Sequence, residues 1–513
     1  MPRVDDTLNT SMDKVWEARG LSRRDAERMG KLVEVWRHTY PKNRLRRDFY
    51  SMHIKAENIG VAISEDLENK LRTACGWPSK AVDMLAARSI PDGFVFESGA
   101  QDDDLRRIVR DNDLINKYAQ AATSELIHSG MAWTLSRNPI GRSQVSIKTH
   151  SYETSALLWD GEKERIECGM AVIHKSYSKR HGMEVPDIVN LYTDEATVVI
   201  TRDADREWVA DYHYHSMGRP LMEPMVYQPA MGRPFGRSRI SPAVMSVTMR
   251  KLREDMRSEL SAEFFTTPAR YLLGADDEAF EMDRYQAYIG NIFLVSKDED
   301  GDVPQYGQLP QGSMQPHIDY ARALANEFSG YTGIPLHSLG IVSDNPDSAE
   351  AMQMAERDLV QLAEQMNREN GRAMRNVALM ALALDRGPQA SFDDLSDDEF
   401  GVMVKWHNPL MPNIGAAGDA WLKWATAAPW LAETEEFLEG MGFDQATIRR
   451  MLNEKRRIQG RSFMEVSVAD DTAQSDTGVL GGAGAAEGAG AAVRVAGAIR
   501  NEGPRQSGGI VAE

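Results

Sequence analysis

The residues best suited to chemistry are few and lie far apart in the sequence. His213 and His215 alternate, so a strand would place both imidazoles on one face, where they could bind a metal ion. No neighbouring cysteine, histidine or carboxylate supplies the remaining ligands, which favours surface or packing histidines. Asp298, Asp300 and Asp302 offer carboxylate oxygens, but the glycine before Asp302 breaks the residue order of a calcium loop. A solvated hairpin turn is therefore favoured there over a calcium site.

The local signatures of common enzymes are missing from the sequence. It has no GxxxxGK[ST] loop to hold nucleotide phosphates, no GxSxG and no HExxH. Its only cysteines, Cys75 and Cys168, form no CxxC pair, which supports neither a disulfide framework nor a cysteine-rich zinc site. We therefore predict a protein that is not an enzyme, needs no metal or cofactor and is made in a reducing cytosol.

Size and charge narrow the class of protein further. The chain has 513 residues, more than one ordinary domain of about 100 to 200 residues. Its formal net charge of -18 disfavours adhesive DNA binding, because such binding depends on Lys and Arg neutralising phosphates. An acidic surface is also simply a soluble surface. The longest strongly apolar stretch, residues 377–384, is far shorter than the roughly 20 residues that span a bilayer, so no membrane anchor is expected.

The predicted secondary structure changes along the chain from helical to sheet-rich. Amphipathic spacing predicts helices within residues 1–57 and 67–88, and a third helix over 101–129. Short alternating runs between residues 131 and 226 predict a sheet-rich segment. The Pro/Gly-dense stretch 220–236 that ends it can sustain neither a helix nor a strand period.

Three helices are expected next. Ser241 is a suitable N-cap and Pro242 suits the first helical position, which predicts a helix start. Its apolar residues recur at steps of three and four, namely Met245, Met249, Leu252, Met256, Leu260 and Phe264. A mixed segment and a shorter helix over 316–329 follow. Asp347 and Glu350 then open a long helix to about residue 384, with a kink expected near Asn370 and Gly371.

The C-terminal part is predicted to contain a strand over 401–406 and helices over 414–459. Residues 466–513 are Gly/Ala-rich and low in complexity, so they cannot bury enough apolar area to offset chain entropy and are expected to be disordered. The fold class predicted from the whole pattern is α+β and mainly helical.

The order of these parts, with two local motifs, carries a family resemblance. Phe235-Gly236-Arg237-Ser238-Arg239-Ile240 opens the first helix of the three. Gly333-Ile334-Pro335-Leu336 and Asn345-Pro346-Asp347-Ser348-Ala349-Glu350-Ala351 precede and open the last. Over roughly residues 15–460 this order resembles the portal proteins of tailed bacteriophages with long non-contractile tails.

The resemblance implies a ring, usually of twelve identical subunits, with wing, stem, clip and crown regions around an axial channel. Carried onto this chain, it implies the following division: wing 1–237, first stem helix 238–265, clip 266–315, second stem helix 316–337, tunnel loop 338–347, long kinked helix and return to the wing 348–410, crown 411–465, and a tail 466–513 without a counterpart.

The resemblance also implies roles for particular residues. Met245, Met249, Leu252, Met256 and Leu260 would pack the stem. Ser343, Asp344 and Asn345 of the tunnel loop would approach DNA, and Asp298, Asp300 and Asp302 of the clip would dock partners. Arg250, Lys251, Arg253 and Arg257 would either form lateral salt bridges between subunits or face the channel as a positive belt.

The implied function is a passive conduit at the capsid vertex of the virion for packaging and ejecting double-stranded DNA and for joining head to tail, after synthesis in the host bacterial cytoplasm. The implied partners are further copies of the chain, sliding DNA, the terminase motor, a head-to-tail adaptor, and the major capsid and scaffolding proteins. Two alternatives remain at this point: a capsid-associated or scaffolding protein without a channel, and an enzyme that uses the His213 and His215 pair.

Overall fold

The computed structural model describes residues 12–55, 73–97, 103–138, 143–178, 183–203, 207–266, 270–273, 305–308, 312–341, 349–410, 414–443 and 447–458. The chain divides into two compact units, Met1–Met411 and Pro412–Glu513. It combines helices with antiparallel strands, and helices account for the larger share, so the predicted mixture of α and β structure is confirmed. The expected disordered tail, 466–513, lies outside the described residues.

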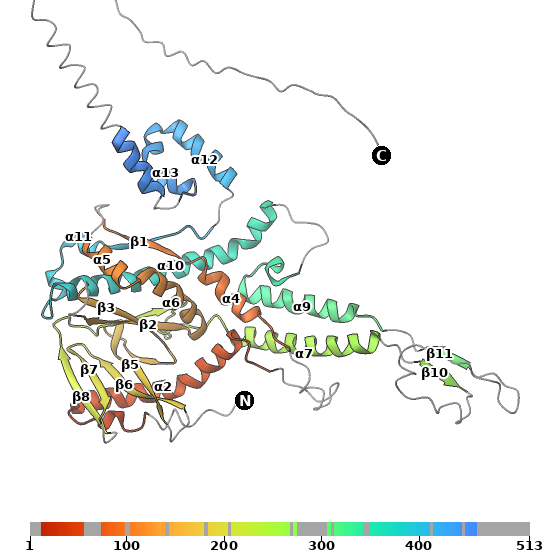
Figure 1. Ribbon diagram of the computed structural model, residues 1–513, viewed down its shortest axis with the longest axis horizontal. Helices are drawn as coiled ribbons and strands as arrows, with labels where there is room; N and C mark the ends of the chain where they lie inside the picture. The colour runs from red at the N-terminus through yellow and green to blue at the C-terminus, as the bar shows by residue number, and fades with distance from the viewer. Residues whose placement is uncertain are drawn as a thin grey trace, which may run out of the picture. The chain divides into compact units, whose positions relative to one another are not determined.

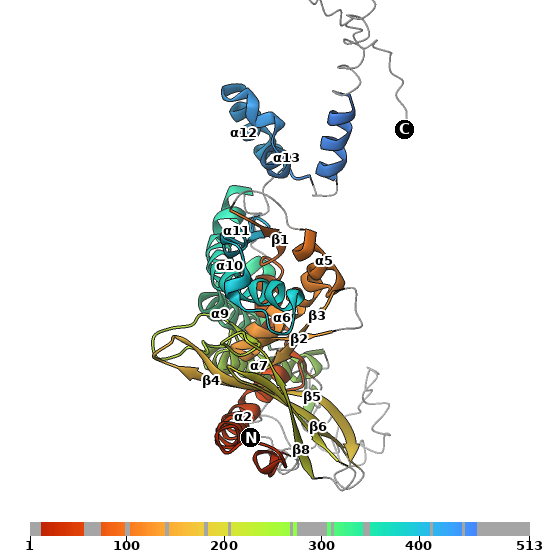
Figure 2. The ribbon, with the colours of Figure 1, turned by 90° about the vertical axis from the view of Figure 1, so that its left-hand side faces the viewer.

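A five-stranded antiparallel sheet lies where the sequence predicts strands, with the order β4-β5-β6-β7-β8. Its strands are β4 (Ser155–Asp160), β5 (Arg165–Ser178), β6 (Met183–Tyr192), β7 (Ala196–Arg202) and β8 (Trp208–Tyr214). Helix α2 (Arg23–Tyr50) packs against this sheet (Figure 2). Met29, Leu32 and Trp36 recur on one face of α2, and all three are buried in a shared core with the strands.

A smaller antiparallel sheet, in the order β3-β2-β9, holds the second core. Its strands are β2 (Gly130–Arg137), β3 (Val145–Ser151) and β9 (Met222–Val226). Helices α6 (Leu114–His128) and α10 (Ala349–Arg386) both contact it. Trp133 of β2, Leu126 of α6 and Met374 of α10 are fully buried in this core.

The single helix predicted over residues 101–129 is wrong, because two helices occupy that region. Helix α5 (Asp103–Asp111) ends before α6 begins, and Asp113 between them has φ 50°, in the left-handed region. The Asn112 side chain holds the break in place: it donates to the Val145 carbonyl at 3.0 Å and accepts from the Ile147 amide at 2.8 Å. A tertiary contact with β3 therefore overrides the helical pattern.

Helices α7 (Pro242–Thr266) and α9 (Gln315–Thr332) lie side by side, and the short pair β10 (Arg270–Leu273) and β11 (Gln305–Gln308) joins them (Figure 1). The predicted start of α7 is confirmed, since the Ser241 hydroxyl accepts from the Val244 amide at 3.3 Å. Helix α10 runs without interruption over 38 residues, and the kink near Asn370 stays a prediction.

The other elements in the described part of the first unit are α4 (Trp77–Ala86), α11 (Asp397–Phe400), the 3-10 turns Val15–Glu17, Leu336–Leu339 and Phe392–Asp394, and the antiparallel pair β1 (Pro91–Val95) and β12 (Met403–Trp406). The second unit contains α12 (Ile414–Ala427), a 3-10 turn (Pro429–Glu433), α13 (Glu435–Gly440) and a further helix over 447–458. Within it, the rings of Trp421 and Phe437 meet edge to face at 5.8 Å.

Candidate functional site at the paired helices

The pair α7 and α9 is held together by two polar clusters that cross between the helices. Arg250 of α7 donates to the Glu327 carboxylate of α9 at 2.5 Å, and this hydrogen bond lowers the pKa of Glu327. Further along, His317 of α9 contacts the Glu254 carboxylate at 2.5 Å through Nδ1 and the Ser261 hydroxyl at 3.0 Å through Nε2. These contacts fix the two helices against one another.

The order hydroxyl, imidazole and carboxylate in Ser261, His317 and Glu254 is also that of an activated nucleophile. Ser261 lies inside α7, however, where backbone amides are committed to the hydrogen bonds of the helix. They are therefore not free to stabilise an oxyanion beside the hydroxyl. The arrangement is suited to fastening two helices.

The base of the pair is fixed by Arg239, which precedes α7. The residue is only 7% exposed. Its guanidinium donates to the carbonyls of Ala81 in α4 and Thr332 at the end of α9, the latter at 2.7 Å. A third contact joins it to the Tyr227 hydroxyl at 3.3 Å. Burial lowers the pKa of this guanidinium. One buried cation thus ties the start of α7 to the end of α9 and to α4.

Two neighbours in the same motif shape this base. The Ser238 hydroxyl donates to the Ile127 carbonyl at 2.6 Å, which attaches the motif to the end of α6. Gly236 has φ +59°, and a Cβ there would lie 2.2 Å from the Tyr227 carbonyl oxygen. Only glycine allows the chain to pass so close to Tyr227. The segment Gly236 to Ile240 therefore attaches the paired helices to the body of the first unit.

The apolar stripe of α7 has a partner inside the chain. Leu252 and Met256 are buried with Cys75 in a small core, against which Met249 and Leu260 are partly buried. Met245 packs against the larger core. Four of the five residues predicted to pack the stem therefore share a small core with Cys75, which lies just before α4.

The basic residues of α7 also have partners within the chain. Besides the Arg250 pair, Lys251 contacts Asp255 and Arg257 lies 3.9 Å from Glu254. Lys251 also lies 5.6 Å from the centroid of the Trp77 ring. Three of the four candidates for lateral salt bridges or a channel belt are thus paired inside one subunit.

The structure does not place the other predicted site residues at the paired helices. Ser343, Asp344 and Asn345, and the clip residues Asp298, Asp300 and Asp302, all lie outside the described residues. His213 is exposed on β8, while burial lowers the pKa of His215 just beyond that strand. Among the described residues no three metal-binding side chains cluster.

A buried carboxyl that sequence reasoning missed lies beneath α10. Glu125 of α6 is fully buried, accepts from the Asn370 amide at 2.8 Å, and has its pKa raised to about 8 by burial. The same Asn370 amide donates to the Tyr118 hydroxyl at 2.9 Å. Leu114, Tyr118 and Glu125 share one face of α6, so the helical pattern already placed Glu125 on an apolar face.

Comparison with known proteins decides the class. A profile of the family described as "Phage portal protein, SPP1 Gp6-like" matches residues 31–461. The chain belongs to this family of phage portal proteins. The expected function, a portal protein at the capsid vertex, is confirmed, and the alternative of a scaffolding protein is not supported. The family is structural.

Individual portal proteins agree with the family. The portal protein of Mycobacterium phage L5 is 26% identical over 384 residues, which cover 72% of this chain and 76% of that protein. The portal protein of Mycobacterium phage D29 is 25% identical over 420 residues, covering 80% and 84%. Among the described residues no helix is long and apolar enough to cross a membrane.

Two solved structures are also similar at low identity. The neck of an empty GTA particle, computed with C6 symmetry, gives a TM-score of 0.38 at 12% identity, over 77% of this chain and 94% of that one. The virion of a native gene transfer agent (GTA) particle gives a TM-score of 0.36 at 12% identity, over 80% of this chain and 98% of that one.

Proposed function

We propose that copies of this portal protein, twelve in number, close into a ring whose axial channel conducts double-stranded DNA into the capsid and out of it. The observation that carries the proposal is the family match over residues 31–461. The ring stands at the capsid vertex of the virion, where it joins head to tail. The subunit is not an enzyme in this account, and the terminase motor supplies the force that moves DNA.

The paired helices are the part of this chain that fits a stem. Helix α7 leaves the body at Arg239, and α9 returns to the body at Thr332, the residue whose carbonyl Arg239 binds. The two helices therefore leave and rejoin the body at one fixed base, as a stem that carries a clip, residues 266–315, at its far end requires. Asp298, Asp300 and Asp302 within the clip would dock the adaptor and the terminase.

The remaining regions follow the same division. Residues 1–237 and 348–410 form the wing, 338–347 the tunnel loop, and 411–465 the crown. The boundary between the two compact units, at Pro412, supports a crown that begins near residue 411. Ser343, Asp344 and Asn345 would make loose contacts with DNA, because a chain of net charge -18 offers phosphates little attraction.

The tunnel loop provides the functional test. Deleting residues 341–346 in the phage should leave rings and capsids intact but produce heads without packaged DNA, measured as DNase-protected DNA per head. Deleting residues 481–486, an equally short piece of the Gly/Ala-rich tail, is the matched control and should leave packaging unchanged. Normal packaging after the loop deletion would overturn the assignment of this segment.

A further inference from the structure

The helix over residues 447–458 has a charge opposite to that of the chain as a whole. Lys and Arg make up 59 of the 513 residues, about one in nine, against 77 acidic residues. In this helix they are five of twelve positions, with Glu454 as the single acidic residue. Such enrichment within an acidic protein points to a local partner that is negatively charged.

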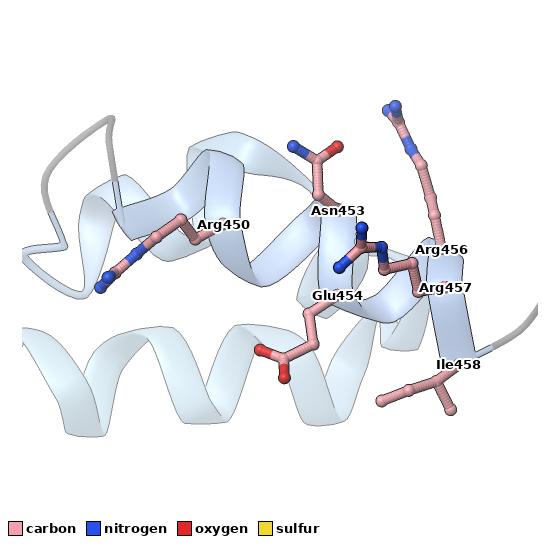
Figure 3. Close-up of a pocket in the computed structure, with 6 residues that line it drawn as sticks. All are labelled: Arg450, Asn453, Glu454, Arg456, Arg457 and Ile458. Carbon is pink, nitrogen blue, oxygen red and sulfur yellow. The ribbon is translucent and has the colours of Figure 1, made fainter.

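The arginines are presented outward by the burial of the other side of the helix. Ile448 is fully buried in the second unit, whereas Arg450, Arg456 and Arg457 are exposed. Figure 3 shows these three side chains extending from the helix, with Asn453 and Glu454 between them. Among the described residues no carboxylate forms an ion pair with any of the three. Their guanidinium groups are therefore available to an external anion.

The spacing repeats along the helix. Arg450 and Arg457 are seven residues apart, so they lie on one face about 10.5 Å apart along the helix axis. Arg456 precedes Arg457 in the chain and is also exposed. Cations spaced along the helix in this way suit an extended polyanion with repeated phosphates better than a single small ion.

A simpler explanation covers only part of this pattern. Cations in the last turn of a helix interact favourably with its dipole, which would account for Arg456 and Arg457. Arg450 lies in the first turn, where the dipole disfavours a cation, and it gains no ion pair in exchange. Helix stability alone therefore does not explain why both ends are basic.

We propose that the helix 447–458 is a binding surface for the phosphate backbone of double-stranded DNA, independent of sequence. The proposal rests on the proposed function, since DNA is the polyanion that a portal ring conducts. This helix would be a basic surface, on an otherwise acidic subunit, that binds DNA by electrostatic attraction. Arg450, Arg456 and Arg457 would each contact a phosphate.

The test measures binding of full-length rings to a random-sequence DNA duplex by fluorescence anisotropy between 50 and 200 mM salt. Each phosphate contact contributes about 0.9 to the slope of log K against log salt. The triple variant Arg450→Gln, Arg456→Gln, Arg457→Gln should lower that slope by about 2.7 per engaged subunit. Over this fourfold salt range the wild-type affinity should then fall about 40-fold further than that of the variant.

Two controls make the result specific. The variant Arg23→Gln, Lys31→Gln, Arg110→Gln removes the same charge from exposed residues of the first unit and should leave the slope unchanged. The triple Arg→Lys variant at 450, 456 and 457 should retain binding, because phosphates respond to charge. An equal loss of slope in the first-unit variant would show a general charge effect and overturn the proposal.

Other outcomes separate this inference from the proposed function. If the purified wild type forms no rings, the proposed function fails. If rings form and bind DNA with the same slope before and after the triple substitution, this inference fails alone. Poly-glutamate serves as a protein-like polyanion: binding of poly-glutamate that the triple variant loses, with DNA binding unchanged, would mean an acidic protein partner and would also overturn the inference.

Discussion

The sharpest structural prediction concerns Arg239 at the base of the paired helices. Lysine keeps the charge but replaces a planar group of five donors with a compact ammonium on a flexible stem. It cannot reach the Ala81 and Thr332 carbonyls and the Tyr227 hydroxyl together. We expect Arg239→Lys to lose two of these three hydrogen bonds.

The magnitude follows from the type of bond lost. A hydrogen bond to a charged group contributes about 1.5–3 kcal/mol, so losing two lowers the free energy of local opening by about 3–6 kcal/mol. Since each 1.4 kcal/mol is about a factor of ten, amide exchange should accelerate by about 100-fold or more. The effect should appear in α4 and at the end of α9, the two elements that Arg239 joins.

Hydrogen exchange followed by mass spectrometry measures this opening without requiring the whole ring to unfold in one step. Arg237→Lys is the matched control, because Arg237 lies in the same motif but is exposed. It should leave exchange in α4 and α9 unchanged. Equal exchange in the two variants, or no acceleration in Arg239→Lys, would refute the role of Arg239 as the anchor.

Two further predictions concern single positions in the body. Gly236→Ala should lower the free energy of unfolding, measured in urea, by clearly more than Gly232→Ala does. Both glycines have positive φ, which costs alanine about 1–2 kcal/mol. Only at Gly236 would the added Cβ also clash with the Tyr227 carbonyl. Equal losses of unfolding free energy in the two variants would contradict the close approach of Gly236 to the Tyr227 carbonyl. The pKa of Glu125 is raised to about 8, so its stabilising contribution is complete below about pH 4.5 and declines, by up to about 1.4 kcal/mol per pH unit, as pH rises towards 8. Glu125→Gln should abolish that part of the pH dependence, and an unchanged difference in urea midpoint between pH 5 and pH 8 would contradict it.

The sequence predicted a helix or its start well where neighbouring residues alone determine it. The start of α7 follows from Ser241 and Pro242, whose capping geometry depends on neighbouring residues alone. The break between α5 and α6 was missed because Asn112 takes its partners from β3, which periodicity does not reveal. Helix patterns could not show a turn that a distant strand stabilises.

In the candidate site, too, the sequence revealed local patterns but not the distant partners of those residues. The apolar stripe of α7 was visible from its spacing, but its partner, the segment with Cys75, was not, because nothing in the sequence pairs the two. Arg239 was recognised as part of a motif without its role, since a buried arginine bound to carbonyls looks like any basic residue in a sequence. Glu125 could have been found, since it falls on the apolar face of α6.

A ring of portal subunits around a channel can be seen directly by negative-stain electron microscopy of the purified full-length chain. We expect closed rings with a central hole and one uniform subunit number in end-on views. Filaments, shells or stable monomers would contradict it.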